Sequence, residues 1–312
     1  MKVAYLFPGQ GAQESGMLHS LPEHPAVAAT LAEAPVADDA ASLRSTVTAQ
    51  LALYLASVAS ARALSAQDAH PDAVAGHSVG GFAAAVVAGV LTFEEGLAAV
   101  RLRATMMERD FSLRYGMVAV LGLPLPALRR VVADISTNDD PLYVALINAR
   151  DQIVVAGSGG GLDRVPAAVK AAGARDARRL DVNVLSHCPP LAPVASALRT
   201  QLAAIPRRTP RVPCYCDTTG RLTSNGAVVL DDLAAGVATT VQWDGAVPLL
   251  SELGTELFVQ MPPGDTLARL AARDTSRHQV LALGGVALDD AVIRIRRVND
   301  SAAADHDQAA QA

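Results

Sequence analysis

Residues 73–88 read AVAGHSVGGFAAAVVA, and this stretch decides the fold. The apolar run 73–75 predicts a strand and 83–88 predicts a helix. Between them lies the pattern G-x-S-x-G with Ser78 at its centre. This pattern is typical of a nucleophile elbow, in which glycines permit a tight turn that presents a serine hydroxyl at a helix N-terminus. The alternative is a glycine-rich strand–helix turn with an incidental serine.

A serine hydroxyl needs a base before it can act as a nucleophile. The chain has seven histidines. Those expected to be solvated lie in polar or terminal segments: His19, His24, His70, His278 and His306. His77 adjoins Ser78 on the tight turn and is badly placed to take its proton. His187 remains, after an apolar run at 180–184 that predicts a strand, although a structural histidine is the commoner explanation for such a residue taken alone.

Arg103 lies on the helix expected to follow the elbow. Thr92-Phe93-Glu94-Glu95 has the pattern of a capping box, so this helix should begin there and continue to about Arg109. The face around Arg103 is apolar, with Ala99, Val100, Met106 and Met107. An arginine on such a face costs free energy unless it is paired, and a bound carboxylate is one possible partner. The alternatives are an arginine that reaches water along its stem or pairs with a glutamate.

The remaining pattern predicts an α/β fold with two parts. Residues 3–7 should form a buried strand that runs into a glycine-containing loop. After Gly116 the order strand, helix, strand, strand, helix, strand predicts a small ferredoxin-like insert. The predicted division is an α/β-hydrolase-like large domain at 1–114 and 186–298, a ferredoxin-like small domain at 115–185, and a polar, disordered tail at 299–312.

Composition excludes several classes of protein. With 312 residues, 51% of them hydrophobic and 18% charged, the chain is long and apolar enough for a large core. A net charge of −5 gives no basic field for nucleic acid. The chain has three cysteines, Cys188, Cys214 and Cys216, a number that indicates a reducing compartment and no disulfide framework. Cys214 and Cys216 could be one half of a metal site, but no second pair of Cys or His ligands accompanies them, so a metal is not predicted.

No targeting or membrane segment is predicted. The N-terminus lacks a signal-peptide pattern. The uncharged stretch 79–91 is shorter than the roughly 20 residues needed to span a bilayer. We therefore expect a cytoplasmic protein that binds neither membrane nor nucleic acid.

These motifs, in their order and spacing, resemble the malonyl-CoA:acyl carrier protein transacylase family. The resemblance extends from Phe7 to Gly264. Its markers are Phe7-Pro8-Gly9-Gln10-Gly11-Ala12-Gln13, the elbow at 76–80, Arg103, Ser186-His187-Cys188, Val241-Gln242-Trp243 and Pro263-Gly264. The resemblance implies a ping-pong reaction in a cleft between the two domains, with malonyl-CoA as donor and the phosphopantetheine-type thiol of a carrier protein as acceptor. It implies no bound cofactor or metal.

The resemblance also implies a role for each matching residue. Ser78 would attack the malonyl thioester and His187 would take its proton. The backbone amides of Gln10 and Val79 would hold the oxyanion. Arg103 would bind the malonyl carboxylate.

Further positions carry supporting roles in the family. His77 and Asn148 would contribute to substrate binding. A backbone carbonyl, here that of Gly236, would orient the histidine in place of an aspartate. The sequence departs from the family at Gly236, where Gln or Asn is usual, at Gly81, where many members have Glu, and at Leu185, which replaces a frequent proline.

Within this family the chain looks most like the transacylase subunit of malonate decarboxylase, often called epsilon. The stretches 45–53 and 261–264 carry that likeness, and the acceptor would be the decarboxylase's small carrier subunit. A fatty-acid synthesis transacylase is the alternative. A serine esterase or thioesterase, and a non-catalytic docking subunit, are more distant alternatives. For docking of an acidic carrier, the basic clusters at 175–179 and 207–211 are candidates, with an ordinary solvated face as the other explanation.

Overall fold

Two β-sheets carry the fold in this computed structural model, which describes residues 1–111, 114–274 and 278–310. Within these residues the first sheet has six strands, mostly parallel, and the second has five, mostly antiparallel. Helices alternate with the strands in both parts. The predicted mixed α/β class is therefore confirmed.

The first sheet has β1 and β2 at its centre. Its order is β11 (Gln279–Ala282), β10 (Leu257–Gln260), β1 (Val3–Phe7), β2 (Ala73–Gly76), β7 (Cys214–Cys216) and β8 (Arg221–Thr223). Neighbouring strands are parallel, except that β8 is antiparallel to β7. Every residue of β1, β2 and β10 is buried, as is typical of parallel strands covered on both faces. Phe7 pairs with Gly76, so the carboxyl ends of β1 and β2 lie side by side.

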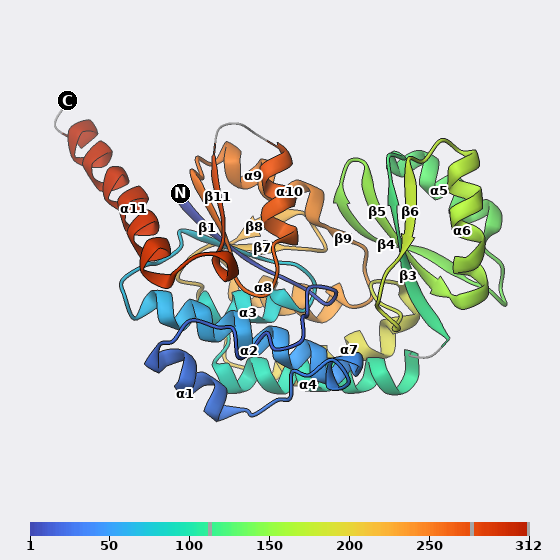
Figure 1. The fold of residues 1–312 in the computed structure, drawn as a ribbon, viewed down its shortest axis with the longest axis horizontal. Helices are drawn as coiled ribbons and strands as arrows, with labels where there is room; N and C mark the ends of the chain where they lie inside the picture. The colour runs from blue at the N-terminus through green and yellow to red at the C-terminus, as the bar shows by residue number, and fades with distance from the viewer. Residues whose placement is uncertain (112–113, 275–277, 311–312) are drawn as a thin grey trace.

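Helices cover both faces of this sheet (Figure 1). Below it in the view lie α1 (Pro25–Glu33), α2 (Thr46–Ser65), α3 (Gly80–Val87), α4 (Phe93–Phe111), α7 (Ala192–Ala203) and α8 (Gly226–Gly236). Above it lie α9 (Ala246–Glu252) and α10 (Thr266–Asp274). The last helix, α11 (Leu288–Ala310), projects away from the body toward the C-terminus.

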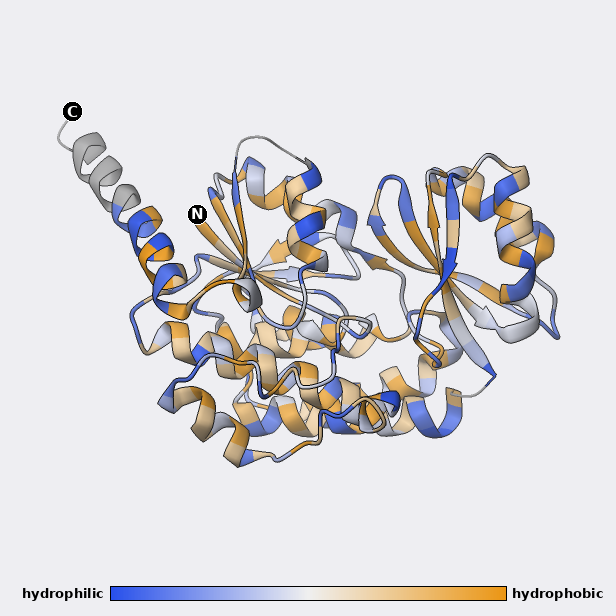
Figure 2. Cartoon of the chain, viewed as in Figure 1, coloured by the Kyte–Doolittle hydropathy of each residue, from blue (hydrophilic) through white to orange (hydrophobic). Residues whose placement is uncertain are grey.

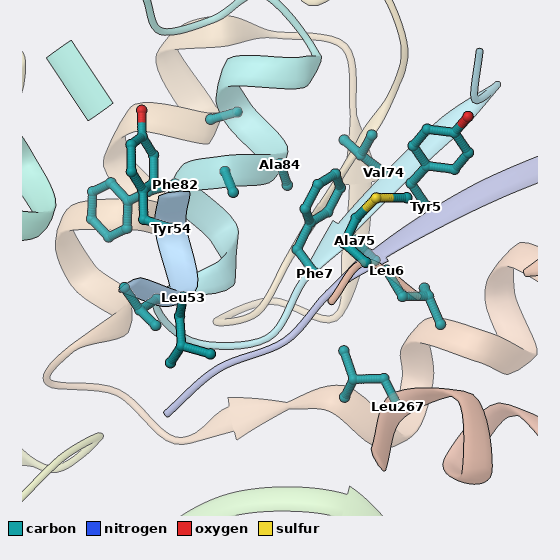
Figure 3. Packing of buried hydrophobic residues seen from close by; sticks show 14 of the residues in the cluster. Tyr5, Leu6, Phe7, Leu53, Tyr54, Val74, Ala75, Phe82, Ala84 and Leu267 are labelled. Carbon is teal, nitrogen blue, oxygen red and sulfur yellow. The ribbon is translucent and has the colours of Figure 1, made fainter. Parts of the chain in front are cut away.

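The main core lies on both faces of the first sheet and includes residues of the helices below it and of α9 and α10 above it. Figure 3 shows side chains of β1, β2 and α3 gathered into one apolar cluster, among them Phe7, Val74 and Phe82. Leu53 and Tyr54 of α2 belong to the same cluster. The packing fixes the strand–turn–helix unit that contains residues 73–88.

Helix α2 is apolar on every side because it lies inside this core. By length and composition it could cross a membrane, with a mean hydropathy of 1.3, but 83% of its apolar window is buried in the protein. A helix that is hydrophobic all round is typical of the centre of a large core. The sequence prediction considered only 79–91 and so overlooked this longer stretch.

The second sheet forms a smaller unit with its own core. Its order is β6 (Asp176–Arg179), β3 (Tyr115–Leu121), β5 (Gln152–Ser158), β4 (Leu142–Ala149) and β9 (Val241–Gln242). The helices α5 (Leu125–Ile135) and α6 (Gly159–Ala171) pack on it, on the side away from the first sheet (Figure 1). In Figure 2 much of β4 and β5 is hydrophobic, while β6 is largely hydrophilic and α5 and α6 carry hydrophilic bands. The order β3, α5, β4, β5, α6, β6 is the one the sequence predicts.

The two units join along a short parallel ladder. β9 comes from the C-terminal half of the chain and pairs with β4, placing Leu146 opposite Val241. The sequence pattern contains no signal for this pairing, because two residues are too few to show a strand period. The ladder brings the second sheet close to the elbow.

Two sequence predictions differ from the structure. The strand expected at 180–184 is not formed: β6 ends at Arg179, and the apolar Val182 and Val184 are buried in the main core. Residues 180–184 include apolar side chains because these contribute to this core, and not because they form a strand. The tail expected to be irregular from residue 299 continues α11 as far as Ala310, consistent with the high helix propensity of alanine.

Candidate active site

Ser78 sits on a turn that only glycines allow. β2 ends at Gly76, α3 begins at Gly80, and Ser78 between them has φ of 57°. A Cβ on Gly76 would lie 2.3 Å from the amide nitrogen of Gly81, and one on Gly80 would lie 2.2 Å from the carbonyl oxygen of Phe7. Both glycines of G-x-S-x-G are therefore required sterically. The left-handed conformation at a serine is uncommon, and such positions concentrate at functional sites.

His187 faces the Ser78 hydroxyl. Its Nε2 lies 2.7 Å from Ser78 Oγ, and its Nδ1 lies 2.6 Å from the carbonyl oxygen of Gly236. A carbonyl can only accept, so Nδ1 carries the proton and Nε2 is free to accept one from the serine. Burial and the nearby Arg103 guanidinium lower the pKa of His187 to about 3. The imidazole is therefore neutral at physiological pH, the form that a base requires.

Arg103 reaches the same hydroxyl from α4. The predicted capping box is formed: the Thr92 amide donates to Glu95 Oε2 and the Glu95 amide to Thr92 Oγ1. Arg103 is 2% exposed, which excludes the surface alternative. Its Nη2 donates to Ser78 Oγ at 3.1 Å and its Nη1 to Gln50 Oε1 at 2.6 Å.

No ion pair among the described residues neutralises the charge of Arg103. Within the described part of the chain, no carboxylate lies within 4.0 Å of its guanidinium. Burial lowers the pKa of Arg103 to about 10, and a negative charge on Asp217 would act in the opposite direction. A buried cation without an anion is unfavourable. The arrangement therefore suits an anionic group supplied by a ligand.

Gln50 holds the arginine and was missed by sequence reasoning. It is fully buried on α2, accepts from Arg103, and donates from its Nε2 to Gln10 Oε1 at 3.0 Å. A glutamine within an otherwise apolar helical run was the available signal, because a buried amide needs partners. Through Gln50 the side chains of α4, α2 and the loop after β1 form one network.

The loop after β1 presses against the elbow. A Cβ on Gly9 would lie 2.6 Å from the carbonyl oxygen of His77. Gln10 follows directly, so its backbone lies next to the turn that carries Ser78. Val79 precedes the first residue of α3 and is buried. The backbone amides of Gln10 and Val79, predicted as oxyanion donors, thus come from adjacent segments at the same sheet edge.

His77 and Asn148 lie together, on the side toward the second sheet. His77 Nε2 is 3.0 Å from Asn148 Oδ1, and the His77 ring meets Trp243 edge-on with centroids 5.3 Å apart. Burial lowers the pKa of His77. Among the described residues, no hydrogen bond joins either side chain to Ser78, His187 or Arg103. The pair ties β4 to the elbow, and its contact with substrate stays a prediction.

Two carboxyl groups beneath the elbow, buried Asp217 and half-buried Asp232, were also missed. Asp217, just after β7, accepts the backbone amide of Ser78 on Oδ2 at 2.8 Å. Asp232 of α8 accepts the Asp217 amide at 3.0 Å. Local sequence does not reveal them, because an aspartate after a strand is usually a turn residue and these contacts join residues far apart in the chain.

A small cavity and a larger groove border the site. A small cavity of about 30 Å³ is lined by Ser78, Arg103, His187, Asp217 and Asp232, among others. An open groove of about 550 Å³ has His187 in its wall together with residues of α5, β4 and the segment after α8. The groove runs between the two units, so a ligand can approach His187 from solvent.

The sequence matches the model of the acyl transferase domain family over residues 4–286. The malonyl CoA-acyl carrier protein transacylase of Escherichia coli K12 is 33% identical over 284 residues, which cover 86% of this chain and 92% of that protein. The transacylase of the same name from Bacillus subtilis is 28% identical and covers 96% of this chain and 99% of its own length.

Solved structures agree over nearly the whole length. The malonyl CoA-acyl carrier protein transacylase of Coxiella burnetii superimposes with a TM-score of 0.88 at 29% identity, covering 96% of this chain and 98% of its own. A malonyl-transacylase solved in complex with a type II PKS acyl-carrier protein gives 0.84 at 29% identity, covering 90% and 96%. The chain therefore belongs to the acyl transferase domain family, and its relatives include malonyl-CoA–acyl carrier protein transacylases.

Proposed function

We propose that the protein transfers a malonyl group from malonyl-CoA to the thiol of an acyl carrier protein. The observation that carries this proposal is the convergence of His187 Nε2 and Arg103 Nη2 on Ser78 Oγ. A serine with a neutral imidazole can attack a thioester, and a buried unpaired guanidinium selects an acyl group that ends in a carboxylate. The named activity of the relatives supports the same reaction.

The reaction would run in two halves. His187 takes the proton of Ser78 as its Oγ attacks the thioester carbonyl; the C–S bond breaks, and the proton passes to the departing CoA sulfur. In the second half, His187 takes the proton of the carrier thiol as its sulfur attacks the carbonyl of the malonyl–serine ester. The bond between that carbonyl carbon and Ser78 Oγ breaks, and His187 returns the proton to Oγ. The product CoA leaves before the carrier acts, so the kinetics are ping-pong.

Electrostatics would stabilise each tetrahedral intermediate. The backbone amides of Gln10 and Val79 are proposed as donors to the oxyanion, with the α3 N-terminus behind them. The Gly236 carbonyl would hold the imidazolium that forms when His187 accepts a proton. Arg103 would bind the malonyl carboxylate, with His77 and Asn148 contributing to the substrate wall.

We further propose that the two sheets correspond to two domains. Residues 1–114 and 186–298 would form the α/β-hydrolase-like part and 115–185 the ferredoxin-like insert. The strand order β6, β3, β5, β4 and the separate core of the second unit support this division. The groove beside His187 would then be the cleft between the domains. A cytoplasmic location belongs to the same proposal.

For the acceptor, we propose the carrier subunit of malonate decarboxylase. The stretches 45–53 and 261–264 support this choice over a fatty-acid carrier. The first stretch contains Gln50, which contacts the substrate-binding arginine. The test is a transfer assay with the purified decarboxylase carrier and the purified fatty-acid carrier, each in the holo form. Faster malonyl transfer to the former is expected, and equal or faster transfer to the latter would favour a fatty-acid synthesis role.

The basic cluster proposed for docking at 175–179 is largely neutralised. Arg175 lies 3.5 Å from Asp151, Arg178 lies 2.5 Å from Asp176, and Arg179 lies 2.8 Å from Asp163. In the second cluster, Arg208 pairs with Glu95. Exposed pairs of this kind reduce the local field. The cluster at 175–179 therefore gives weaker support for carrier docking than its sequence suggests.

An esterase is the alternative that shares the elbow. Its acyl preference would be for neutral groups, and it would gain nothing from Arg103. Incubation with radiolabelled malonyl-CoA, followed by peptide mapping, distinguishes the possibilities. Labelling of Ser78 that is discharged by a carrier thiol is expected. Failure to label Ser78 would favour a docking subunit without catalysis, and rapid discharge by water would favour the esterase.

A further inference from the structure

Beneath the nucleophile the structure places a buried carboxyl group, that of Asp217, beside a half-buried one, that of Asp232, and the proposed reaction uses neither. Asp217 is 6% exposed, and its Oδ2 accepts the backbone amide of Ser78 at 2.8 Å. This amide belongs to the residue in the strained left-handed conformation, so Asp217 holds the strained turn directly. Asp232, from α8, lies against the backbone of Asp217.

The two carboxyl groups have unequal environments. Asp232 accepts the amides of Asp217 and Thr218, each at 3.0 Å, and also the Thr218 hydroxyl. Among the described residues, the side chain of Asp217 accepts only the Ser78 amide, on Oδ2, and its Oδ1 is buried with no hydrogen-bond partner. Hydrogen bonds to a carboxylate favour its charged form, and two adjacent buried carboxylates resist ionising together. Asp232 is thus the better place for the negative charge.

The groups around Asp217 also favour its neutral form. Burial, followed by the charge of Asp232, raises the pKa of Asp217 well above its usual range, while the Ser78 amide and Arg103 act in the opposite direction. Burial also raises the pKa values of Tyr215 and Cys216, on the strand that leads to Asp217, so both are neutral at physiological pH. The charged groups facing Asp217 from the described elements are therefore Arg103 of α4 and Asp232 of α8.

A small cavity connects Asp217 to the reacting groups. It has a volume of about 30 Å³, and its lining includes Ser78, Arg103, His187 and both aspartates. That volume is sufficient for one water molecule, which a proton on Asp217 Oδ1 could reach. Asp217 and the arginine proposed to bind malonate thus line the same cavity.

We propose that Asp217 is a positioning residue that acts as a neutral carboxylic acid: Oδ2 holds the Ser78 amide, and the proton on Oδ1 keeps negative charge away from Arg103. The inference rests on the malonyl transfer proposed above. With Asp217 neutral, the guanidinium remains available for the substrate carboxylate. With Asp217 ionised, the site contains its own anion, which competes for Arg103 and repels the substrate.

Malonyl binding and protonation of Asp217 are therefore coupled. Above the pKa of Asp217, malonyl binding must be accompanied by proton uptake. The KM for malonyl-CoA should then rise by about tenfold per pH unit in that range. The KM for acetyl-CoA, which brings no carboxylate, should not show this rise.

The experiment measures KM for malonyl-CoA between pH 6 and 9 in the wild type, D217N, D232N and the control D231N. In D217N the side-chain amide oxygen can still accept the Ser78 amide, but the group cannot ionise. D217N should remove the rise of KM at alkaline pH. Only the loss of charge on Arg103, whose pKa is about 10, should then still raise KM. D232N should move the rise to lower pH, because it removes the neighbour that disfavours ionisation of Asp217. Exposed Asp231, on the same helix, should retain the wild-type profile when changed to Asn.

A second readout does not depend on activity. Infrared difference spectra at neutral pH should show the C=O band of a protonated carboxylic acid in the wild type and not in D217N. The raised pKa means that Asp217 stabilises the fold least at high pH, so D217N should gain more thermal stability at pH 8 than at pH 5. An alkaline rise that persists in D217N, or a missing band in an enzyme that transfers malonyl normally, would overturn the inference. A wild type that shows the band but transfers no malonyl would instead overturn the proposed function.

Discussion

His187 and Arg103 reach the same hydroxyl from two regions that hold them differently. The main chain fixes His187: its amide donates to the Val237 carbonyl at 2.8 Å and its Nδ1 to that of Gly236. A side chain fixes Arg103, through the bond to Gln50 Oε1. The position of the base is thus a property of the fold, whereas the position of the cation depends on side chains, those of Gln50 and Ser78.

The two regions are also coupled through charge. The Arg103 guanidinium is one cause of the lowered pKa of His187, after burial. A malonyl carboxylate on Arg103 would offset that charge and make His187 a stronger base. The substrate would then assist the base that activates the attacking serine. Mutations in each region distinguish the main-chain support from the side-chain support.

The largest effect is expected from the base itself. We predict that His187→Asn lowers kcat by about 10⁴-fold or more, because Ser78 loses its proton acceptor. Asn is preferable to Ala here, since His187 has φ of 59° and Asn tolerates that conformation. The measurement is steady-state malonyl transfer, with exposed His70→Asn as the control. Retention of a tenth of the wild-type rate by His187→Asn would contradict the assignment.

Loss of the cation should be smaller and selective. Arg103→Ala is predicted to reduce kcat/KM for malonyl-CoA by about 10²–10³-fold, equivalent to about 3–4 kcal/mol, because the carboxylate loses a desolvated charged partner. Acetyl-CoA should lose far less. Arg101→Ala, an exposed change on the same helix, is the matched control. Equal losses for the two acyl groups would show that Arg103 supports the serine and does not select malonate.

The elbow and its cation were predictable from sequence, and the layer that supports them was not. Gly76 and Gly80 appear in a fixed local pattern because a tight turn has no room for side chains there. Arg103 was detectable because its helical neighbours are apolar. Asp217 meets Ser78 across 139 residues, so its role depends on how β7 and β2 pair. Local periodicity does not contain that information.

The side-chain support of Arg103 should be adjustable. Gln50→Leu removes an acceptor and is predicted to lower kcat/KM for malonyl-CoA by about tenfold. Gln50→Glu places a carboxylate against the guanidinium and should lower it further, by about 10–100-fold, because the site then contains a competing anion.

The pH profile gives the sign of the coupling. A glutamate at position 50 offsets the charge of Arg103, so the pKa of His187 should rise. Activity requires neutral His187, and the acid limb of kcat/KM should therefore move to higher pH in Gln50→Glu but less so in Gln50→Leu. An unchanged acid limb in Gln50→Glu would show that Arg103 does not influence the base.

The smallest effect is expected where only the main chain is used. Gly236→Ala should leave the His187 bond intact, since the acceptor is a backbone carbonyl and a Cβ there would meet only Thr218 Cγ2, at 3.9 Å. Alanine at this helix end should raise the free energy of unfolding by about 0.5–1 kcal/mol, through helix propensity and a less flexible unfolded chain. Thermal unfolding and kcat, measured on the same preparation, test both statements. A stabilised variant with kcat within about threefold of the wild type is expected, because neither the carbonyl nor the space around it has changed. A loss of tenfold or more would mean that the conformation of Gly236 itself positions the imidazole, and the contrast between a base held by the fold and a cation held by a side chain would no longer hold.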